Sequence, residues 1–293
     1  MGAPIVPSAG LPPLGAHVSI AGGLHRAPER AARIGADALQ LFTKAPQRWA
    51  ERCVTEEEAA AFRAARETAG IRVAASHDSY LINLASPDPG LRVRSARAFR
   101  AELARCEILG LELLVTHPGN ATGGDRDRAL FQNAELVAEA MRAVPGKTRV
   151  LLETTAGSGR SLGCSFEEIA VLIDGLPSEA RDRIGVCLDT AHVYAAGYDL
   201  RGEYDAVLGR FDQIVGLERL ALIHCNDSAA ALGSRRDRHA EIGKGKLGER
   251  VFESLMRDER LAQVPRVLEI PKGSDPAATD RRNLALLRRL ARS

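Results

Sequence analysis

The sequence predicts an α/β protein in which eight repeats of strand and helix close into a single (β/α)8 barrel. Its length of 293 residues suits one barrel of typical size. Short apolar runs rich in Val, Ile and Leu alternate with amphipathic helical stretches along the chain. No linker-like or low-complexity tract occurs after residue 15. We therefore expect one catalytic barrel domain over residues 14–293, preceded by a disordered, proline-containing leader over residues 1–13.

The elements follow one another in the order that a barrel requires. Strands are expected where four or five aliphatic residues occur together, at 15–19, 38–42, 72–76, 112–116, 149–152, 184–188, 221–223 and 266–268. Helices are expected in the longer stretches with apolar residues every three or four positions, among them 56–68, 89–109, 126–143, 166–175, 248–257 and 277–292.

Composition restricts the class of protein. No apolar run is long enough to span a bilayer, and the N-terminus lacks the pattern of a secretory signal, so a cytoplasmic protein without a membrane partner is expected. The five cysteines are scattered and include no CxxC pair, which favours reduced thiols. A net charge of +2 does not by itself indicate binding to nucleic acid.

The residues that follow the strands are the most informative feature, because barrel active sites are built from the C-terminal strand ends and the loops beyond them. From the third strand onward these positions hold imidazoles and carboxylates, which are ligands of zinc. The potential ligands are His77, His117, Glu153, Asp189, His192, His224, Asp237, His239 and Glu269. Six consecutive strands therefore direct ligands to one rim, and the seventh loop adds Asp237 and His239.

Each of these residues alone has a structural alternative as a buried core histidine or a helix cap. Their joint placement favours a metal site, since five of the seven histidines lie at these strand ends or in adjoining loops. We expect a supporting or structural role for His17 and His25. Asp227, in the seventh loop, is expected to stabilise that loop.

The number of ligands indicates more than one metal. Nine are too many for a single four-coordinate zinc that keeps an open position, so two or three ions are implied. A carboxylate can bridge two ions, and Glu153, with Asp189 as a second candidate, suits this role. Hydroxide held between the ions is a strong nucleophile near neutral pH, and the other ions neutralise the phosphate and the leaving oxygen. The cluster therefore indicates hydrolysis of a phosphodiester.

Three loops are candidates for contact with DNA. Gln47, Arg48 and Trp49 follow the second strand, and Tyr80 and Leu81 follow the third. A planar or apolar side chain can enter a base stack beside an extruded nucleotide, but Trp49 and Leu81 could equally pack against helices. The basic side chains of the seventh loop are candidates for backbone phosphates, with a solvated face as the alternative: Arg235, Arg236, Arg238, Lys244 and Lys246.

Seven segments resemble the endonuclease IV family of apurinic/apyrimidinic endonucleases, and the resemblance extends from Gly15 over nearly the whole chain. The shorter segments are GAHVSIAGG, LFTK, HDSYLINLAS and THPG. The most specific are LETTAGSG at 152–159, GVCLDTAHVYAAGYD at 185–199 and HCNDSAAALGSRRDRHAEIGKGKLG at 224–248. By contrast, GKGK at 243–246 lacks the spacing of a phosphate-binding P-loop, and no GxSxG motif occurs.

The resemblance implies a TIM barrel with three zinc ions, with manganese an alternative at one site. It implies a monomeric hydrolase of the deoxyribonuclease IV type, bound to damaged double-stranded DNA at the nucleoid, that cleaves 5′ to an abasic site and leaves a 3′-hydroxyl and a 5′-deoxyribose phosphate. Glu153 and Glu269 are the residues assigned to catalysis through a metal-bound hydroxide. The implied ligand sets are His77, His117 and Glu153; Glu153, Asp189, His224 and Glu269; and His192, Asp237 and His239.

The resemblance also implies that the lesion nucleotide is flipped into the pocket, with the segments of Gln47 and of Tyr80 and Leu81 entering the helix. Four positions depart from residues that are common in the family, and none of them removes a ligand. Gln47 replaces arginine, Ser158 replaces glutamine, Ala191 replaces cysteine and Cys225 replaces leucine.

Two other functions remain open from the sequence. A sugar isomerase or epimerase on the same barrel needs fewer metal ligands and leaves His192, Asp237 and His239 unexplained. A DNA-damage binding module without catalysis is opposed by the intact ligand set.

Overall fold

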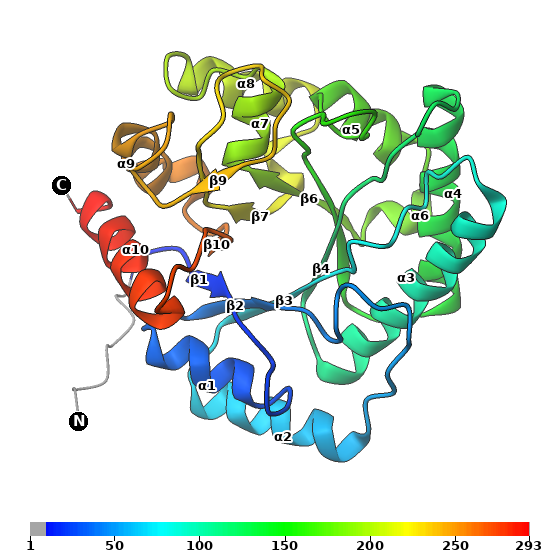
Figure 1. The fold of residues 1–293 in the computed structure, drawn as a ribbon, viewed down its shortest axis with the longest axis horizontal. Helices are drawn as coiled ribbons and strands as arrows, with labels where there is room; N and C mark the ends of the chain where they lie inside the picture. The colour runs from blue at the N-terminus through cyan, green and yellow to red at the C-terminus, as the bar shows by residue number, and fades with distance from the viewer. Residues whose placement is uncertain (1–9, 293) are drawn as a thin grey trace.

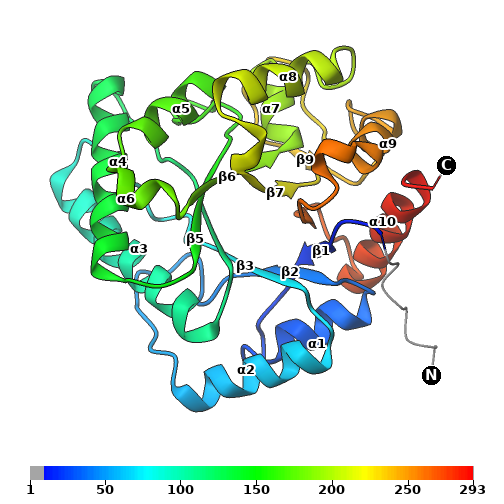
Figure 2. The same ribbon diagram turned by 180° about the vertical axis from the view of Figure 1, so that it is seen from behind.

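A computed structural model describes residues 10–292 as a closed barrel of parallel strands enclosed by helices (Figure 1). The strands are hydrogen-bonded in the order β1-β10-β7-β6-β5-β4-β3-β2, so the first strand pairs with both the second and the last. The predicted (β/α)8 TIM barrel is therefore confirmed, and Figure 2 shows the same closed ring from behind.

The barrel strands lie close to their predicted positions. They are β1 Leu14–His17, β2 Ala38–Leu41, β3 Val73–His77, β4 Leu113–Thr116, β5 Arg149–Glu153, β6 Ile184–Asp189, β7 Leu220–His224 and β10 Arg266–Leu268. The loop after β7 adds a short antiparallel pair, β8 Asp227–Ser228 and β9 His239–Ala240, which the sequence analysis did not foresee.

The outer layer contains ten α-helices and two 3-10 turns among the described residues. They are α1 Arg26–Arg33, α2 Glu56–Thr68, α3 Pro89–Leu109, α4 Arg126–Ala143, α5 Phe166–Asp174, α6 Ser178–Arg181, α7 Thr190–Ala196, α8 Tyr204–Ile214, α9 Glu249–Arg257, α10 Pro276–Leu290, η1 Leu217–Arg219 and η2 Glu259–Leu261. The bounds of α2, α3 and α4 match the prediction, whereas α1, α6, α7 and α8 were not among the predicted ranges.

Local capping signals explain why the predicted helix ends are accurate. Thr55 and Glu58 form a reciprocal capping box at the start of α2. The carboxylates of Asp88 and Asp125 accept backbone N–H groups in the first turns of α3 and α4. Helix α3 ends at Gly110, whose φ of 71° lies in the left-handed region that glycine tolerates. These signals lie within a few residues of each boundary and are readable from sequence.

The two faces of the strands build two separate cores, because side chains alternate along a strand. Outward-facing residues join the large apolar layer between the sheet and the helices. Inward-facing residues form a smaller cluster inside the barrel: Ala75, Leu113, Val115, Leu151, Cys187, Leu222 and Val267. One alternation further toward the C-terminal end, the inward positions are polar: His77, His117, Glu153, Asp189, His224 and Glu269. The strand period therefore places six potential ligands in one layer above an apolar plug.

The start of the barrel lies slightly before the predicted domain boundary. Residues 1–9 of the predicted leader lie outside the described residues. Pro12 and Pro13 are buried, and the Pro13 carbonyl accepts the backbone N–H of Arg266 at 2.8 Å. Pro12 and Pro13, which the prediction placed in the leader, are therefore packed with the barrel. Within residues 10–292, no helix combines the length and apolar character needed to cross a bilayer.

Candidate metal centre

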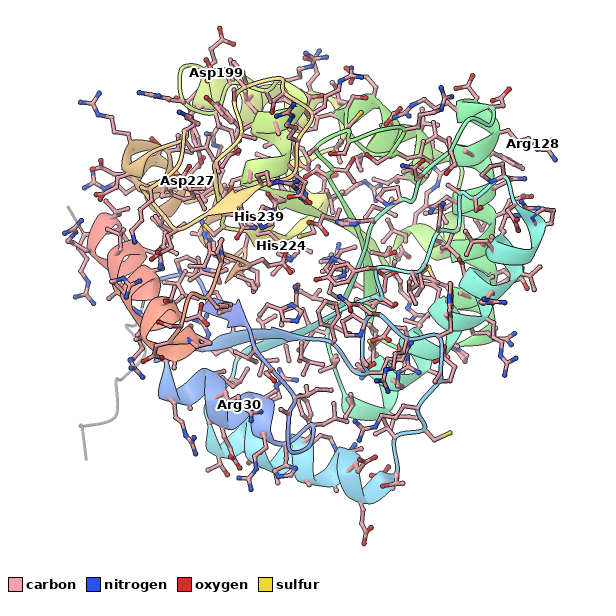
Figure 3. All side chains as sticks on the ribbon, viewed as in Figure 1. Arg30, Arg128, Asp199, His224, Asp227 and His239 are labelled. Carbon is pink, nitrogen blue, oxygen red and sulfur yellow. The ribbon has the colours of Figure 1, made fainter. Side chains whose placement is uncertain are left out.

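All nine predicted ligands meet at the C-terminal end of the barrel. Figure 3 shows His224 and His239 near the centre of the ring, although they come from a strand end and from the loop beyond it. Donor atoms within 4.8 Å of one another define three overlapping groups: His77, His117 and Glu153; Glu153, Asp189, His224 and Glu269; and Asp189, His192 and His239. Glu153 and Asp189 each belong to two groups.

Glu153 lies at the centre of the cluster, fully buried at the end of β5. Its Oε2 is 3.0 Å from His77 Nε2 and 3.1 Å from His117 Nε2. Its Oε1 is 2.9 Å from His224 Nδ1 and 3.4 Å from His192 Nδ1. Each carboxylate oxygen thus faces a different pair of imidazoles, the arrangement that a bridging carboxylate requires.

The second group gathers around His224, whose Nδ1 points into the cluster. This nitrogen is 3.1 Å from Glu269 Oε2 and 3.9 Å from Asp189 Oδ2. His224 and Asp189 are fully buried. Glu153, Asp189 and Glu269 therefore approach a single imidazole nitrogen from three strands.

The third group lies nearest the solvent. His192 Nε2 is 3.3 Å from His239 Nε2, and Asp237 is 3.1 Å from His192 Nε2 and 3.2 Å from His239 Nε2. Asp189 Oδ2 lies 3.5 Å from His239 Nε2. The half-exposed Asp237 completes the set of donors predicted for this group, and Asp189 connects it to the second group.

Three of the histidines are oriented by hydrogen bonds from one ring nitrogen to a backbone carbonyl. Three Nδ1 atoms lie 2.9 to 3.0 Å from backbone carbonyl oxygens, as pairs His77 with Asp78, His192 with Thr154 and His239 with Glu269. A proton on Nδ1 satisfies the carbonyl and leaves Nε2 free as an acceptor. This is the usual supporting arrangement around metal-binding histidines.

Two buried amides that the sequence analysis missed support the carboxylates. Gln40, at the end of β2, accepts from His224 Nε2 at 2.8 Å and donates to Glu269 Oε1 at 2.5 Å. Asn226 donates to Asp189 Oδ2 at 2.6 Å and accepts the backbone N–H of Glu269 at 2.8 Å. Gln40 is the lone polar residue in the strand ALQL and lies two residues after inward-facing Ala38. Because side chains alternate along a strand, this spacing could have identified Gln40 as an inward-facing residue of the site.

The carboxylates of the cluster create an environment that stabilises positive charge on neighbouring groups. Burial opposes ionisation of Glu153, but the charges of His224 and His117 hold its pKa well below the usual range. Burial likewise opposes protonation of His77, yet its hydrogen bond to Glu153 and nearby carboxylate charge raise its pKa to about 10. Burial opposes ionisation of Asp237 too, and contacts with His192 and His239 lower its pKa to about 2. Glu153 and Asp237 are therefore ionised and contribute the negative field that a divalent cation needs.

The chemistry of the donor set fits zinc. Ligands of one tetrahedral zinc, each about 2.0–2.1 Å from the metal, lie about 3.3 Å from one another. The N···O and N···N separations of 3.0 to 3.5 Å within the first and third groups are close to this value. The residues present can therefore hold the ions that the sequence predicts.

A cavity of about 330 Å³ opens above the cluster. Six of the nine candidate ligands line this cavity. The apolar part of its wall consists of Phe42, Tyr80 and Ile270, and Lys272 adds a positive charge. His17 also lines this cavity, 3.4 Å from Glu269 Oε1 and 3.0 Å from Gln40 Nε2, in the supporting position expected for it. His25 precedes α1 and is not part of the wall.

The residues predicted to contact DNA lie at the rim. Gln47 and Arg48 are exposed, Tyr80 is 62% exposed, and Leu81 is half-buried. Trp49 packs against the core, with the Arg94 guanidinium 5.3 Å from its ring centroid, so its packing alternative is the one observed. The arginines of the seventh loop, Arg235, Arg236 and Arg238, are all exposed.

Arg235 has an unusual backbone, with a φ of 53°. Its N–H donates to the Ala195 carbonyl at 2.9 Å, and its carbonyl accepts the Ser158 hydroxyl at 2.8 Å. Ser158, one of the departures from the family pattern, therefore fixes the backbone of this loop. Residues in strained backbone regions persist only when their surroundings hold them, as here.

Asp227 has the stabilising role expected for it. It is fully buried and lies away from the barrel centre toward α9 (Figure 3). Its two oxygens accept four backbone N–H groups, those of Ser228, Gly245, Leu247 and Gly248, at 2.7 to 3.2 Å. The GKGK segment thus folds around a carboxylate rather than a phosphate.

Known proteins share this fold and sequence. Residues 28–290 match the family described as xylose isomerase-like TIM barrel. A protein of Chloroflexus aggregans named probable endonuclease 4 is 47% identical over 285 residues, covering 96% of this chain and 99% of its own. The crystal structure of endonuclease IV from Thermus thermophilus has a TM-score of 0.85 at 38% identity, with 96% of this chain and 99% of that one covered.

A solved D-psicose 3-epimerase from Clostridium cellulolyticum has a TM-score of 0.68, covering 96% of this chain and 98% of that one. At 18% identity it shows only a common fold. The match over nearly the full length to proteins named endonuclease 4, on a barrel whose rim carries all nine candidate ligands, places this chain in the endonuclease IV family of apurinic/apyrimidinic endonucleases.

Proposed function

We propose that the protein is a zinc-dependent DNA-repair endonuclease. It hydrolyses the phosphodiester 5′ to an abasic site in duplex DNA and leaves a 3′-hydroxyl and a 5′-deoxyribose phosphate. The observation that carries this proposal is the convergence of nine candidate ligands in overlapping groups that share Glu153 and Asp189. Relatives named endonuclease 4 support the same activity.

The cluster would hold three zinc ions, with manganese an alternative at one site. The first site comprises His77, His117 and Glu153, the second Glu153, Asp189, His224 and Glu269, and the third His192, Asp237 and His239. When bound, the ions would supply Lewis acidity that activates water near neutral pH and neutralises charge on the phosphate and leaving oxygen.

The protein's own part in the reaction is to hold and orient. Glu153 fixes the separation of the first two sites, because its two oxygens face different imidazoles. Glu269 is held by Gln40 at one oxygen and keeps the other 3.1 Å from His224 Nδ1. Phe42 and Tyr80, with ring centroids 5.2 Å apart, form an apolar part of the cavity wall.

DNA recognition is assigned to the rim. Exposed Tyr80, with Leu81, and exposed Gln47, with Arg48, would enter the helix beside the lesion. Extruding a nucleotide costs least where no base is stacked, which favours an abasic site over intact DNA. Arg235, Arg236 and Arg238 would contact backbone phosphates and fix the position of the duplex.

A sugar isomerase or epimerase is the second candidate, favoured by the common fold alone. Such a reaction leaves the residues of the proposed third site, His192, Asp237 and His239, without a role. A damage-binding module without catalysis leaves the whole ligand set unexplained. The expected monomeric state and cytoplasmic, nucleoid-associated location stay predictions.

The test is a cleavage assay on duplex DNA with one tetrahydrofuran abasic analogue. Zinc-loaded protein should produce a single nick 5′ to the lesion and leave an undamaged duplex of the same sequence intact. Turnover of free ketoses without nicking would favour the isomerase. Tight lesion binding without nicking, at full metal loading, would favour the binding module.

A further inference from the structure

The loop between β2 and α2 is fastened at both ends by one buried side chain on α3. Arg105 is 3% exposed. Its Nε donates to the Thr43 hydroxyl at 2.7 Å, at the start of the loop. Another nitrogen of the same guanidinium donates to the Glu51 carboxylate at 2.8 Å and to the Arg52 carbonyl at 3.3 Å, near the end of the loop. The Arg105 guanidinium thus holds together the two ends of the segment 43–52, whose exposed tip contains Gln47 and Arg48.

Glu102 extends this network to the metal-binding strand. One of its carboxylate oxygens accepts a hydrogen bond from the third nitrogen of the Arg105 guanidinium at 2.5 Å. Its other oxygen accepts the hydroxyls of Thr43 and Ser76, each at 2.7 Å. Ser76 immediately precedes His77, so the buried pair connects the segment 43–52 to a strand that supplies a metal ligand.

The tip of the segment is also restrained. Lys44 donates to the Arg48 carbonyl across the turn, and the Ser79 hydroxyl donates to the Pro46 carbonyl. Ser79 immediately precedes Tyr80, so this bond joins the two loops at the rim. The Arg94 guanidinium covers the ring of Trp49 from α3. The segment is therefore held in one conformation from base to tip.

A buried Arg–Glu pair contributes little net stability compared with apolar residues of the same size, but removing one partner is costly. The pair instead fixes the geometry of the loop, because the planar guanidinium of Arg105 donates to three loop acceptors and to Glu102 at the same time. We propose that Arg105 and Glu102 are positioning residues that preset the segment 43–52 for binding damaged DNA. The DNA part of this inference rests on the proposed endonuclease function.

Trp49 provides a readout that needs no DNA, since it is the single tryptophan of the chain. In Arg105→Met the loop loses its closing donors, so Trp49 emission should shift to longer wavelength and acrylamide quenching should rise about twofold or more. The matched control is Arg183→Met. Arg183 pairs at 3.0 Å with Glu107, which lies on the same helix as Arg105, and it donates to the Val144 and Thr148 carbonyls, outside the segment 43–52. This control should destabilise the protein without changing Trp49.

The functional readout is the split between KM and kcat on the abasic duplex. Arg105→Met should raise KM about tenfold, leave kcat within about twofold and leave zinc content unchanged, because a preset loop contributes equally to ground-state and transition-state binding. Thr43→Val keeps the ion pair and removes only the loop hydroxyl, so it should give a smaller change in the same direction. If Arg105→Met does not fold, Thr43→Val still tests whether the network positions the loop.

Unchanged emission and KM in both folded variants would overturn the proposal. So would equal changes in Arg183→Met, which would indicate general destabilisation, or zinc loss in Thr43→Val, which would indicate an effect on the metal centre. If the wild-type protein does not nick DNA, the proposed function fails, while the emission of Trp49 still decides whether Arg105 positions the loop.

Discussion

Gln40 accepts a hydrogen bond from His224, with 2.8 Å between Gln40 Oε1 and His224 Nε2. The bond places the imidazole proton on Nε2 and leaves Nδ1 free toward Glu153 and Glu269. The amide nitrogen of Gln40 holds Glu269 at the same time. One uncharged side chain therefore orients two of the four donors in the second group.

Gln40→Leu should weaken zinc binding at this group about 10- to 100-fold, because the substitution removes the partner that fixes the His224 tautomer. Competition with a chromogenic chelator measures the change. Gln47→Leu is the matched control, since it makes the same substitution at the exposed loop tip and should retain all metal. Equal retention by both variants would show that Gln40 does not support the site.

Glu153→Ala and Glu269→Ala should each lower the cleavage rate by orders of magnitude while largely sparing lesion binding. Each loses a carboxylate that faces imidazoles of the cluster, whereas the rim arginines that would contact phosphates are untouched. Single-turnover nicking and gel-shift binding separate the two effects. Glu139→Ala on α4 serves as the control, and unimpaired cleavage in both cluster variants would refute the assigned roles.

Purified protein should contain close to three zinc ions per chain by elemental analysis. Exhaustive chelation should abolish nicking, and added zinc should restore it, while far-UV circular dichroism stays near native. Secondary structure should persist because the apolar layers inside and around the barrel do not include the ligands. A content of one or two ions would favour the isomerase.

Arg236→Ala should weaken binding to abasic and undamaged duplexes by similar factors. The slope of log affinity against log salt concentration should fall in magnitude by about one, because one phosphate contact is lost. Fluorescence anisotropy over a salt series measures both quantities. Lys147→Ala, on the exposed loop before β5, should leave the slope unchanged, and an unchanged slope in Arg236→Ala would exclude a phosphate contact.

Asp227→Asn should lower the free energy of unfolding by about 2–4 kcal/mol. The amide cannot accept at both former oxygens, so two of the four backbone N–H groups lose their partner. Urea denaturation measures the loss, and limited proteolysis should detect opening near 241–248. Asp182→Asn, at an exposed position, should change stability by less than about 0.5 kcal/mol, and an equally small effect at Asp227 would contradict the stabilising role.

Much of the fold was predictable because its signals are local. The capping carboxylates, the aliphatic runs and the glycine at the end of α3 each act within a few residues. The nine ligands were predictable for a related reason. Strand ends of a parallel barrel meet at one rim, so residues far apart in sequence, such as His77 and Glu269, are close whenever the barrel closes.

Long-range pairings could not be predicted in this way. Arg105 and Thr43 are 62 positions apart, and Gln40 and His224 are 184 apart. Strand parity marks Gln40 as inward-facing, but no local pattern identifies its partners or distinguishes Arg105 from a surface arginine, because the partners are set by the closed packing of strands and helices. By itself, the sequence determined the barrel and which residues gather at its rim as candidate metal ligands. Only the tertiary structure decided which buried polar side chains orient them, and that Asp189 lies close to the donors of both the second and the third group.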